Sequence, residues 1–181
     1  MTFPNMAFRL KKVLLYGKFK IFTYTKGILI LLNKWDYRYL ALADHISQWS
    51  KDPSRKIGAV AIGPQGQVLS QGYNGFPRGI VDGETRYNNR EEKYKYVVHA
   101  EMNCIYNAAD NGVSLRGSKL YVTGLPTCSD CAKGIIQVGV KGVYMQGDVP
   151  DAWKDSWELT KMLFKEAGVH YELITSGTRS N

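Results

Sequence analysis

The chain has 181 residues, with 24 basic and 16 acidic side chains, a formal net charge of +8 and three cysteines. This length favours one domain with its own hydrophobic core. Three cysteines cannot all pair, and two of them are spaced Cys-x-x-Cys downstream of a histidine. The composition therefore argues against a disulfide framework and favours a metal site in a reducing compartment, so we expect a cytoplasmic protein.

The positive charge is concentrated at the N-terminus. Residues 1–35 carry +7 and no acidic side chain, whereas residues 36–181 carry only +1. The body of the protein is therefore not expected to bind nucleic acid through its charge. The apolar patches at 13–16 and 27–32 are shorter than the ~20 residues of a membrane span. We expect no stable nucleic-acid or membrane partner.

Three interpretations of this N-terminal segment stay open. It is a disordered or loosely docked arm, or sequence translated upstream of the natural start. Alternatively, it is an interaction arm for subunits, nucleic acid or anionic lipid, or a targeting segment without the small-residue cleavage site of a secretory signal. We divide the chain into a basic arm, 1–34, a globular domain, 35–175, and a flexible tail, 176–181.

The elements of the domain follow from hydrophobic periodicity. A helix is predicted to open at Trp35 and to end before Pro53. Strands at 57–62 and 67–72 flank a turn and predict an antiparallel hairpin. A glycine-rich loop follows, and the polar stretch after it is predicted to be a loop with one short helix. The remaining predicted helices run from His99 to about Ala109, from Cys128 to Gly139 and from about Asp151, and the remaining strands lie at 119–123, 141–145 and 169–174.

This order of elements predicts an α/β fold. Helices link the last three strands, and such crossovers make parallel, right-handed connections. We therefore expect a three-layer α/β/α sandwich with a five-stranded mixed sheet. The helices that begin at His99 and Cys128 both follow strands. Their N-termini can meet at one end of the sheet, where folds of this class bind ligands.

Four residues have the spacing of a catalytic zinc site. His99 and Glu101 lie at the start of one predicted helix, and Cys128 and Cys131 lie three residues apart on another. One imidazole and two thiolates suit zinc and leave a position for water, whose pKa the metal lowers towards neutrality. Glu101 cannot easily bind the same ion as its near neighbour, so it is free to transfer protons.

Four blocks resemble, in order, the deoxycytidylate (dCMP) deaminase family of the cytidine-deaminase-like superfamily. They lie at 49–60, 72–79, 95–103 and 128–136, and they include the His-x-Glu and Cys-x-x-Cys pattern of zinc nucleobase deaminases. The resemblance covers 36–175. It implies a cytidine-deaminase-like fold and a hydrolase that acts on the C–N bond of a cyclic amidine, converting dCMP to dUMP and ammonia in the supply of dTMP.

The resemblance also assigns roles at the site. It implies one zinc per chain on His99, Cys128 and Cys131, which activates water for attack at C4 of cytosine. Glu101 would take the proton of the water, protonate N3 and later protonate the departing amine. The backbone at Ala100 would contact the pyrimidine edge.

The remaining substrate contacts concern sugar and phosphate. By resemblance, Asn74 would hydrogen-bond the sugar. A dianionic phosphate needs positive charge, and the nearest candidates are Lys51 and Arg78, with Ser50 beside them. Family members are often hexameric and regulated by dCTP and dTTP. The resemblance therefore implies a homo-oligomer, hexameric or built from dimers, and these effectors with Mg²⁺, for which the loop 75–79 is a compatible site.

The chain departs from the family pattern in two places. Thr127 stands between Pro126 and Cys128, where the family normally has Pro directly before the first metal-binding cysteine, and we expect Thr127 to cap the following helix. The loop 147–151 lacks the Tyr that family members often carry after the fourth strand. Two alternatives stay open: a zinc deaminase acting on another cytosine or adenine nucleotide or on single-stranded nucleic acid, and a structural zinc module or inactive subunit.

Overall fold

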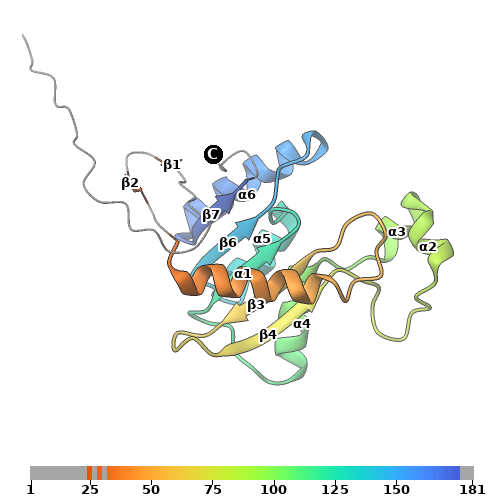
Figure 1. The fold of residues 1–181 in the computed structure, drawn as a ribbon, viewed down its shortest axis with the longest axis horizontal. Helices are drawn as coiled ribbons and strands as arrows, with labels where there is room; N and C mark the ends of the chain where they lie inside the picture. The colour runs from red at the N-terminus through yellow and green to blue at the C-terminus, as the bar shows by residue number, and fades with distance from the viewer. Residues whose placement is uncertain (1–23, 26–27, 30–31, 176–181) are drawn as a thin grey trace, which may run out of the picture.

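The computed structural model describes residues 24–25, 28–29 and 32–175 (Figure 1). The expectations for the rest of the basic arm and for the tail, 176–181, lie outside these residues. The first elements are the short strands β1 (Tyr24–Thr25) and β2 (Ile28–Leu29), which pair with each other in antiparallel fashion.

A five-stranded sheet with the strand order β4-β3-β5-β6-β7 forms the middle layer of the domain. β3 pairs antiparallel with both β4 and β5, whereas β5, β6 and β7 run parallel to one another. This arrangement confirms the mixed sheet. The strands are β3 (Gly58–Ile62), β4 (Val68–Tyr73), β5 (Lys119–Thr123), β6 (Gly142–Gln146) and β7 (His170–Ile174).

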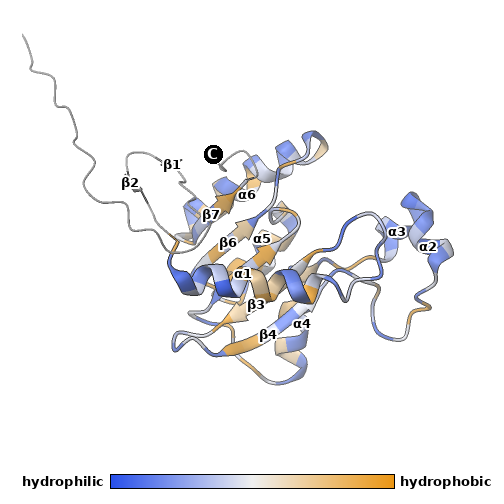
Figure 2. Ribbon diagram, in the orientation of Figure 1, coloured by the Kyte–Doolittle hydropathy of each residue, from blue (hydrophilic) through white to orange (hydrophobic). Residues whose placement is uncertain are grey.

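Helices cover both faces of the sheet, which confirms the α/β/α sandwich. α1 (Lys34–Ser47) packs on one face, against β3 and β5. α4 (Ala100–Asp110) packs against β3 and β4 on the other face, where α5 (Ser129–Gln137) contacts both α4 and α6 (Lys154–Ala167). Figure 2 shows hydrophobic residues concentrated in the strands of this sheet.

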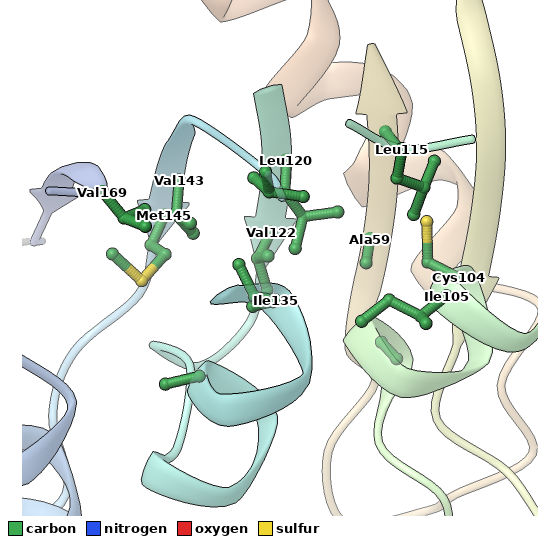
Figure 3. Close-up of a cluster of buried hydrophobic side chains, with 14 of the residues drawn as sticks. Ala59, Cys104, Ile105, Leu115, Leu120, Val122, Ile135, Val143, Met145 and Val169 are labelled. Atoms are coloured by element: carbon green, nitrogen blue, oxygen red, sulfur yellow. The ribbon is translucent and has the colours of Figure 1, made fainter. Parts of the chain in front are cut away.

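The two-residue period of the strands divides the core into two clusters. On β3, Val60 and Ile62 pack towards α1, whereas Ala59 and Ala61 belong to the larger cluster on the opposite face. Figure 3 shows Ile105 of α4 and Ile135 of α5 lying between their helices and the strands. These contacts hold α4 and α5 against the same face of the sheet.

Several helix ends differ from the sequence-based expectation. α1 begins at Lys34 because Asn33 and Asp36 form a reciprocal capping box with the backbone. A domain boundary after residue 34 would therefore cut this helix. Cys128, and not Thr127, is the N-cap of α5, since its Sγ accepts from the N–H of Cys131. The expectation for Thr127 was wrong because a sulfur atom one residue later takes the capping position.

The polar stretch before His99 contains two helices where one was expected. α2 (Glu84–Asn88) and α3 (Arg90–Tyr96) meet at Asn89, which ends the first helix and caps the second by accepting from the N–H of Glu92. Both helices are largely hydrophilic and project from the three layers (Figures 1 and 2). A short 3-10 helix, η1 (Asp151–Trp153), leads into α6. Among the described residues, no helix combines the length and apolar character needed to cross a membrane.

Candidate metal centre and active site

Two helix N-termini bring three potential metal ligands together. His99 is the N-cap residue of α4 and Cys128 that of α5, while Cys131 lies in the first turn of α5. Their ligand atoms all lie within 4.8 Å of one another. The Sγ atoms of both cysteines are 3.4 Å from Nδ1 of His99. The cluster thus unites residues from chain segments about thirty positions apart.

The geometry and chemistry of the cluster fit zinc. With Zn–N near 2.0 Å and Zn–S near 2.3 Å, tetrahedral coordination places neighbouring N and S atoms about 3.5 Å apart. The 3.4 Å separations between His99 and each cysteine agree with this value. Two thiolates and one imidazole are a donor set that zinc prefers, and three protein ligands leave one position open.

Hydrogen bonding within the cluster separates the proton affinities of the ligands. The hydrogen bond from Cys131 is the largest cause that lowers the pKa of Cys128, to about 4, and the contact with His99 lowers it further. The hydrogen bond to Cys128 raises the pKa of His99 to about 9. The pKa of Cys131 is raised for the same reason, since its thiol donates to Cys128. Metal binding displaces the protons that such a cluster holds.

Glu101 lies in the first turn of α4 beside this cluster. Its side chain is almost completely buried, and burial raises the pKa of its carboxyl group above the ordinary value. The nearby His99 acts in the opposite direction and lowers this pKa. A buried carboxyl group whose pKa is moved towards neutrality is suited to both accepting and donating a proton.

His99, Cys128 and Glu101 line a cavity of about 450 Å³. This volume lies in the usual range for small-molecule sites. The aromatic residues Tyr87, Tyr94 and Trp153 contribute to its wall. Trp153 lies with its ring centroid 6.0 Å from that of His99. An aromatic side chain from η1 thus reaches the cavity, although the preceding loop lacks the tyrosine discussed above.

The structure brings only some of the expected substrate residues to this cavity. Asn74 and Ala100 line it, whereas Ser50, Lys51 and Arg78 do not. The buried hydroxyl of Ser50 donates to the carbonyl of Asn74 and so supports a residue of the cavity wall.

The two expected phosphate-binding side chains each face a carboxylate outside the cavity. Lys51 forms an ion pair with Asp82, with 2.9 Å between Nζ and Oδ2. Arg78 forms one with Asp110, at 3.5 Å between Nη1 and Oδ2, and also donates to the side-chain oxygen of Asn107. Neither side chain is placed to meet a ligand inside the cavity.

Three other cations line the cavity, and sequence reasoning missed them. Arg55 follows the first helix, and Arg90 and Lys93 belong to α3. Arg55 lies within the first of the four motif blocks, and that is the signal that could have found it. The position of α3 over the cavity could not be inferred, because it depends on how the polar stretch folds against the loop after α1.

The loop around Cys128 is held from the side of α6. The hydroxyl of Thr160 donates to the carbonyl of Thr127, and the N–H of Ser129 donates to Oγ of Ser156. The side chain of Thr127 is itself buried and hydrogen-bonds Glu101, a contact that lowers the pKa of that carboxyl group. The chain on both sides of Cys128 is therefore tied to one helix, which limits its movement.

Comparisons with known proteins agree with this site. The family described as the cytidine and deoxycytidylate deaminase zinc-binding region matches residues 33–146. The deoxycytidylate deaminase of Mus musculus is 38% identical over 149 residues, covering 78% of this chain and 80% of the relative. The Homo sapiens protein of the same name is 37% identical over 145 residues, with 76% and 78% covered.

A solved structure shows the same relationship in three dimensions. The dCMP deaminase of cyanophage S-TIM5, solved in complex with dCMP and dUMP, is 30% identical with a TM-score of 0.64. The match covers 80% of this chain and the whole of the cyanophage chain. The sequence matches, the fold and the clustering of His99 with two cysteines all agree. This chain belongs to the cytidine and deoxycytidylate deaminase family.

Proposed function

We propose that this protein is a zinc-dependent hydrolase that converts dCMP to dUMP and ammonia and so supplies nucleotide for dTMP synthesis. The observation that carries the proposal is one cavity lined both by His99, Cys128 and Glu101 and by Arg55 and Arg90, which have no ion-pair partner within the described residues. The mouse and human relatives that share 37–38% of their aligned residues with this chain are deoxycytidylate deaminases. The cyanophage relative was solved with dCMP and dUMP bound.

In this proposal, His99, Cys128 and Cys131 hold one zinc ion per chain. Bound zinc supplies the Lewis acidity that makes water nucleophilic at neutral pH. Two helix N-termini keep the three ligand atoms close to one another. Within the described residues, this cluster has three protein ligands and no fourth. Three ligands favour a catalytic site over a structural one.

Glu101 transfers the protons of the reaction. Its carboxylate takes a proton from the attacking water and passes it to N3 of cytosine, while the oxygen of the water bonds to C4. It then takes the second proton from the hydroxyl on C4 and delivers it to the departing amine. The C4–N4 bond breaks, ammonia leaves, and the hydroxyl becomes the C4 carbonyl of the uracil base in dUMP. The burial that raises the pKa of Glu101 supports this role, because an acid–base group works best with a pKa near the working pH.

The base and the sugar are held by groups on neighbouring elements. Ala100 occupies the first position of α4, where a backbone N–H has no partner inside the helix and can donate to a pyrimidine oxygen. Asn74 lines the cavity at the end of β4 and offers its side-chain oxygen to the sugar. Both assignments rest on the family resemblance together with these positions.

We place the substrate phosphate at Arg55 and Arg90. Both side chains belong to exposed residues of the cavity wall, and within the described part of the chain neither has an ion-pair partner. Lys93 is less suitable, because Asp52 already neutralises it at 3.1 Å. Arginine binds phosphate through paired N–H groups, and such charge-assisted hydrogen bonds contribute more than neutral ones. Lys51 and Arg78 are thereby replaced as the phosphate candidates.

The proposal is tested by measuring ammonia release from zinc-loaded protein. Cytidine, deoxycytidine, dCMP, dCTP and a cytosine-bearing single-stranded oligonucleotide are compared. We expect a strong preference for dCMP. Activity on the oligonucleotide alone, or no release from any substrate by zinc-loaded protein, would refute the assignment.

The phosphate contacts are tested with the same assay. Replacing Arg55 or Arg90 by alanine should lower kcat/KM for dCMP by about 10- to 100-fold, the value of one charge-assisted hydrogen bond. The effect on deoxycytidine, which has no phosphate, should be small. Lys51→Ala and Arg78→Ala are the matched controls and should behave as wild type. Equal losses on dCMP and deoxycytidine would show that the arginines do not bind phosphate.

The finer assignments are proposed on the family resemblance. They are dCTP and dTTP, with Mg²⁺, as effectors, a hexameric or dimer-based homo-oligomer, and a cytoplasmic location. Adding each effector to the ammonia assay tests the first, since regulation should change the dependence of rate on dCMP concentration. Light scattering gives the molar mass of the assembly, and a fluorescent fusion of the full chain gives its location.

A further inference from the structure

The hydrogen-bond partners of the Asn74 side chain allow only one orientation of its amide group. Its oxygen accepts from the N–H of Ile57 at 2.8 Å. Its amide nitrogen donates to the carbonyl of Arg55 at 3.0 Å and to Oδ2 of Asp52 at 3.3 Å. A backbone N–H can only donate, and a carbonyl or carboxylate oxygen can only accept. Three partners of fixed polarity therefore agree on the orientation of this amide.

This network determines what Asn74 can offer a ligand. Both of its N–H groups are used, whereas its oxygen has two lone pairs and only one of them has a partner among the described residues. Asn74 lines the cavity and is otherwise buried. It can thus accept a hydrogen bond from a ligand but cannot donate one. In a 5′-deoxynucleotide, the 3′-hydroxyl is the sugar group that can donate.

Asp52 is the member of the network that α3 reaches. Its Oδ1 accepts from the backbone N–H of Ser54 at 2.8 Å and from Nζ of Lys93 at 3.1 Å. The side chains of Asp52 and Lys93 are only 5% and 7% exposed. Lys93 also donates to the hydroxyl of Ser54 at 3.2 Å. The buried negative charge next to Asn74 is therefore compensated by one cation from the helix that forms the cavity wall.

We propose that Asp52 and Lys93 are a positioning pair that determines recognition of the sugar 3′-hydroxyl. Asp52 turns the oxygen of Asn74 towards the ligand, and Lys93 holds Asp52 in place without touching the ligand sugar. This inference deepens the proposed function and rests on it, because it takes the ligand to be a pyrimidine deoxynucleotide. It makes α3 part of substrate selection through a buried ion pair in the cavity wall, next to Asn74.

The variant Asp52→Asn tests the pair with little change in shape. Its remaining side-chain oxygen can still accept from Ser54 and Lys93, but its new NH₂ group faces the NH₂ group of Asn74. Two donors in contact force the Asn74 amide to turn or to withdraw. The double variant Asp52→Asn/Lys93→Met removes both charges together, so it leaves no uncompensated buried charge if the single variant fails to fold.

The measurement is the dissociation constant, by calorimetry, of dUMP and of 2′,3′-dideoxyuridine monophosphate, neither of which is consumed. The wild-type protein, loaded with zinc, should bind dUMP about tenfold more tightly, the value of one good hydrogen bond. In both variants this preference should fall towards one, through loss of affinity for dUMP. Affinity for the dideoxy nucleotide should change little.

Asp36→Asn is the matched control. Asp36 is also buried and accepts from the backbone and from the hydroxyl of Tyr121, but it lies at the start of α1, outside the cavity. This variant should keep the preference for dUMP. Equal loss of affinity for both nucleotides in the Asp52 variants would overturn the inference, as would a wild-type protein with no preference for dUMP.

Turnover of dCMP by the same wild-type preparation is measured separately. A wild-type protein that prefers dUMP over the dideoxy nucleotide but does not turn over dCMP would refute the proposed function and leave this inference standing.

Discussion

Removal of the Lys93 side-chain charge should cost far more stability than removal of an exposed lysine. Lys93 and Asp52 form an ion pair in which both side chains are at least nine-tenths buried. In Lys93→Met, the carboxylate of Asp52 stays buried without its cation. Breaking a buried pair in this way costs about 3–5 kcal/mol. Asp52 still accepts from Ser54, Arg55 and Asn74, so we expect a value near the lower end, about 3 kcal/mol.

Two comparisons isolate the effect of the uncompensated charge. The double variant Asp52→Asn/Lys93→Met has no buried charge at this position and should be more stable than Lys93→Met alone. Lys154 pairs with Asp151 at 2.7 Å, but these side chains are 66% and 93% exposed. Lys154→Met should therefore cost less than about 1 kcal/mol, as exposed ion pairs contribute little.

Urea-induced unfolding of the zinc-loaded proteins gives the free energies directly. Thermal unfolding is a second measure, since 1 kcal/mol moves the midpoint of a domain of this size by about 2–4 °C. Lys93→Met should thus unfold roughly 6–12 °C lower than wild type. If Lys93→Met and Lys154→Met lost the same small free energy, water would reach Asp52 freely, and the argument from burial would be wrong.

Further variants test the metal centre and the ends of the domain. Glu101→Gln should keep one zinc per chain by elemental analysis yet lose about 10²- to 10⁴-fold in kcat; full activity would remove Glu101 from the mechanism. His99→Ala should lose stoichiometric zinc, and unchanged zinc affinity would show that the ligand assignment is wrong. Deletion of residues 1–32 should leave dCMP turnover largely intact, while deletion of 1–34, which also removes the Asn33 cap, should cost about 1 kcal/mol of stability.

Short-range spacing explains why so much of the site could be predicted. Cys128 and Cys131 are three residues apart at the start of a helix, and helix geometry alone brings such side chains to one face. His99 and Glu101 are related in the same local way at the start of α4. The alternation of strands and helices in β5, α5, β6, α6 and β7 likewise requires parallel crossovers, so the topology followed from the order of elements.

Only the tertiary structure decided which cations face the cavity. Lys51 and Arg55 are four residues apart on the same loop, yet Lys51 pairs with Asp82 while Arg55 lines the cavity. The difference depends on where residues of the polar stretch before His99 lie, and this position has no periodic signal in the sequence. Lys93 reaches Asp52 across 41 positions of the chain. Local spacing determined the chemistry of the metal centre, whereas the packing of distant segments determined the groups that surround it, because contacts between separate segments depend on the whole fold.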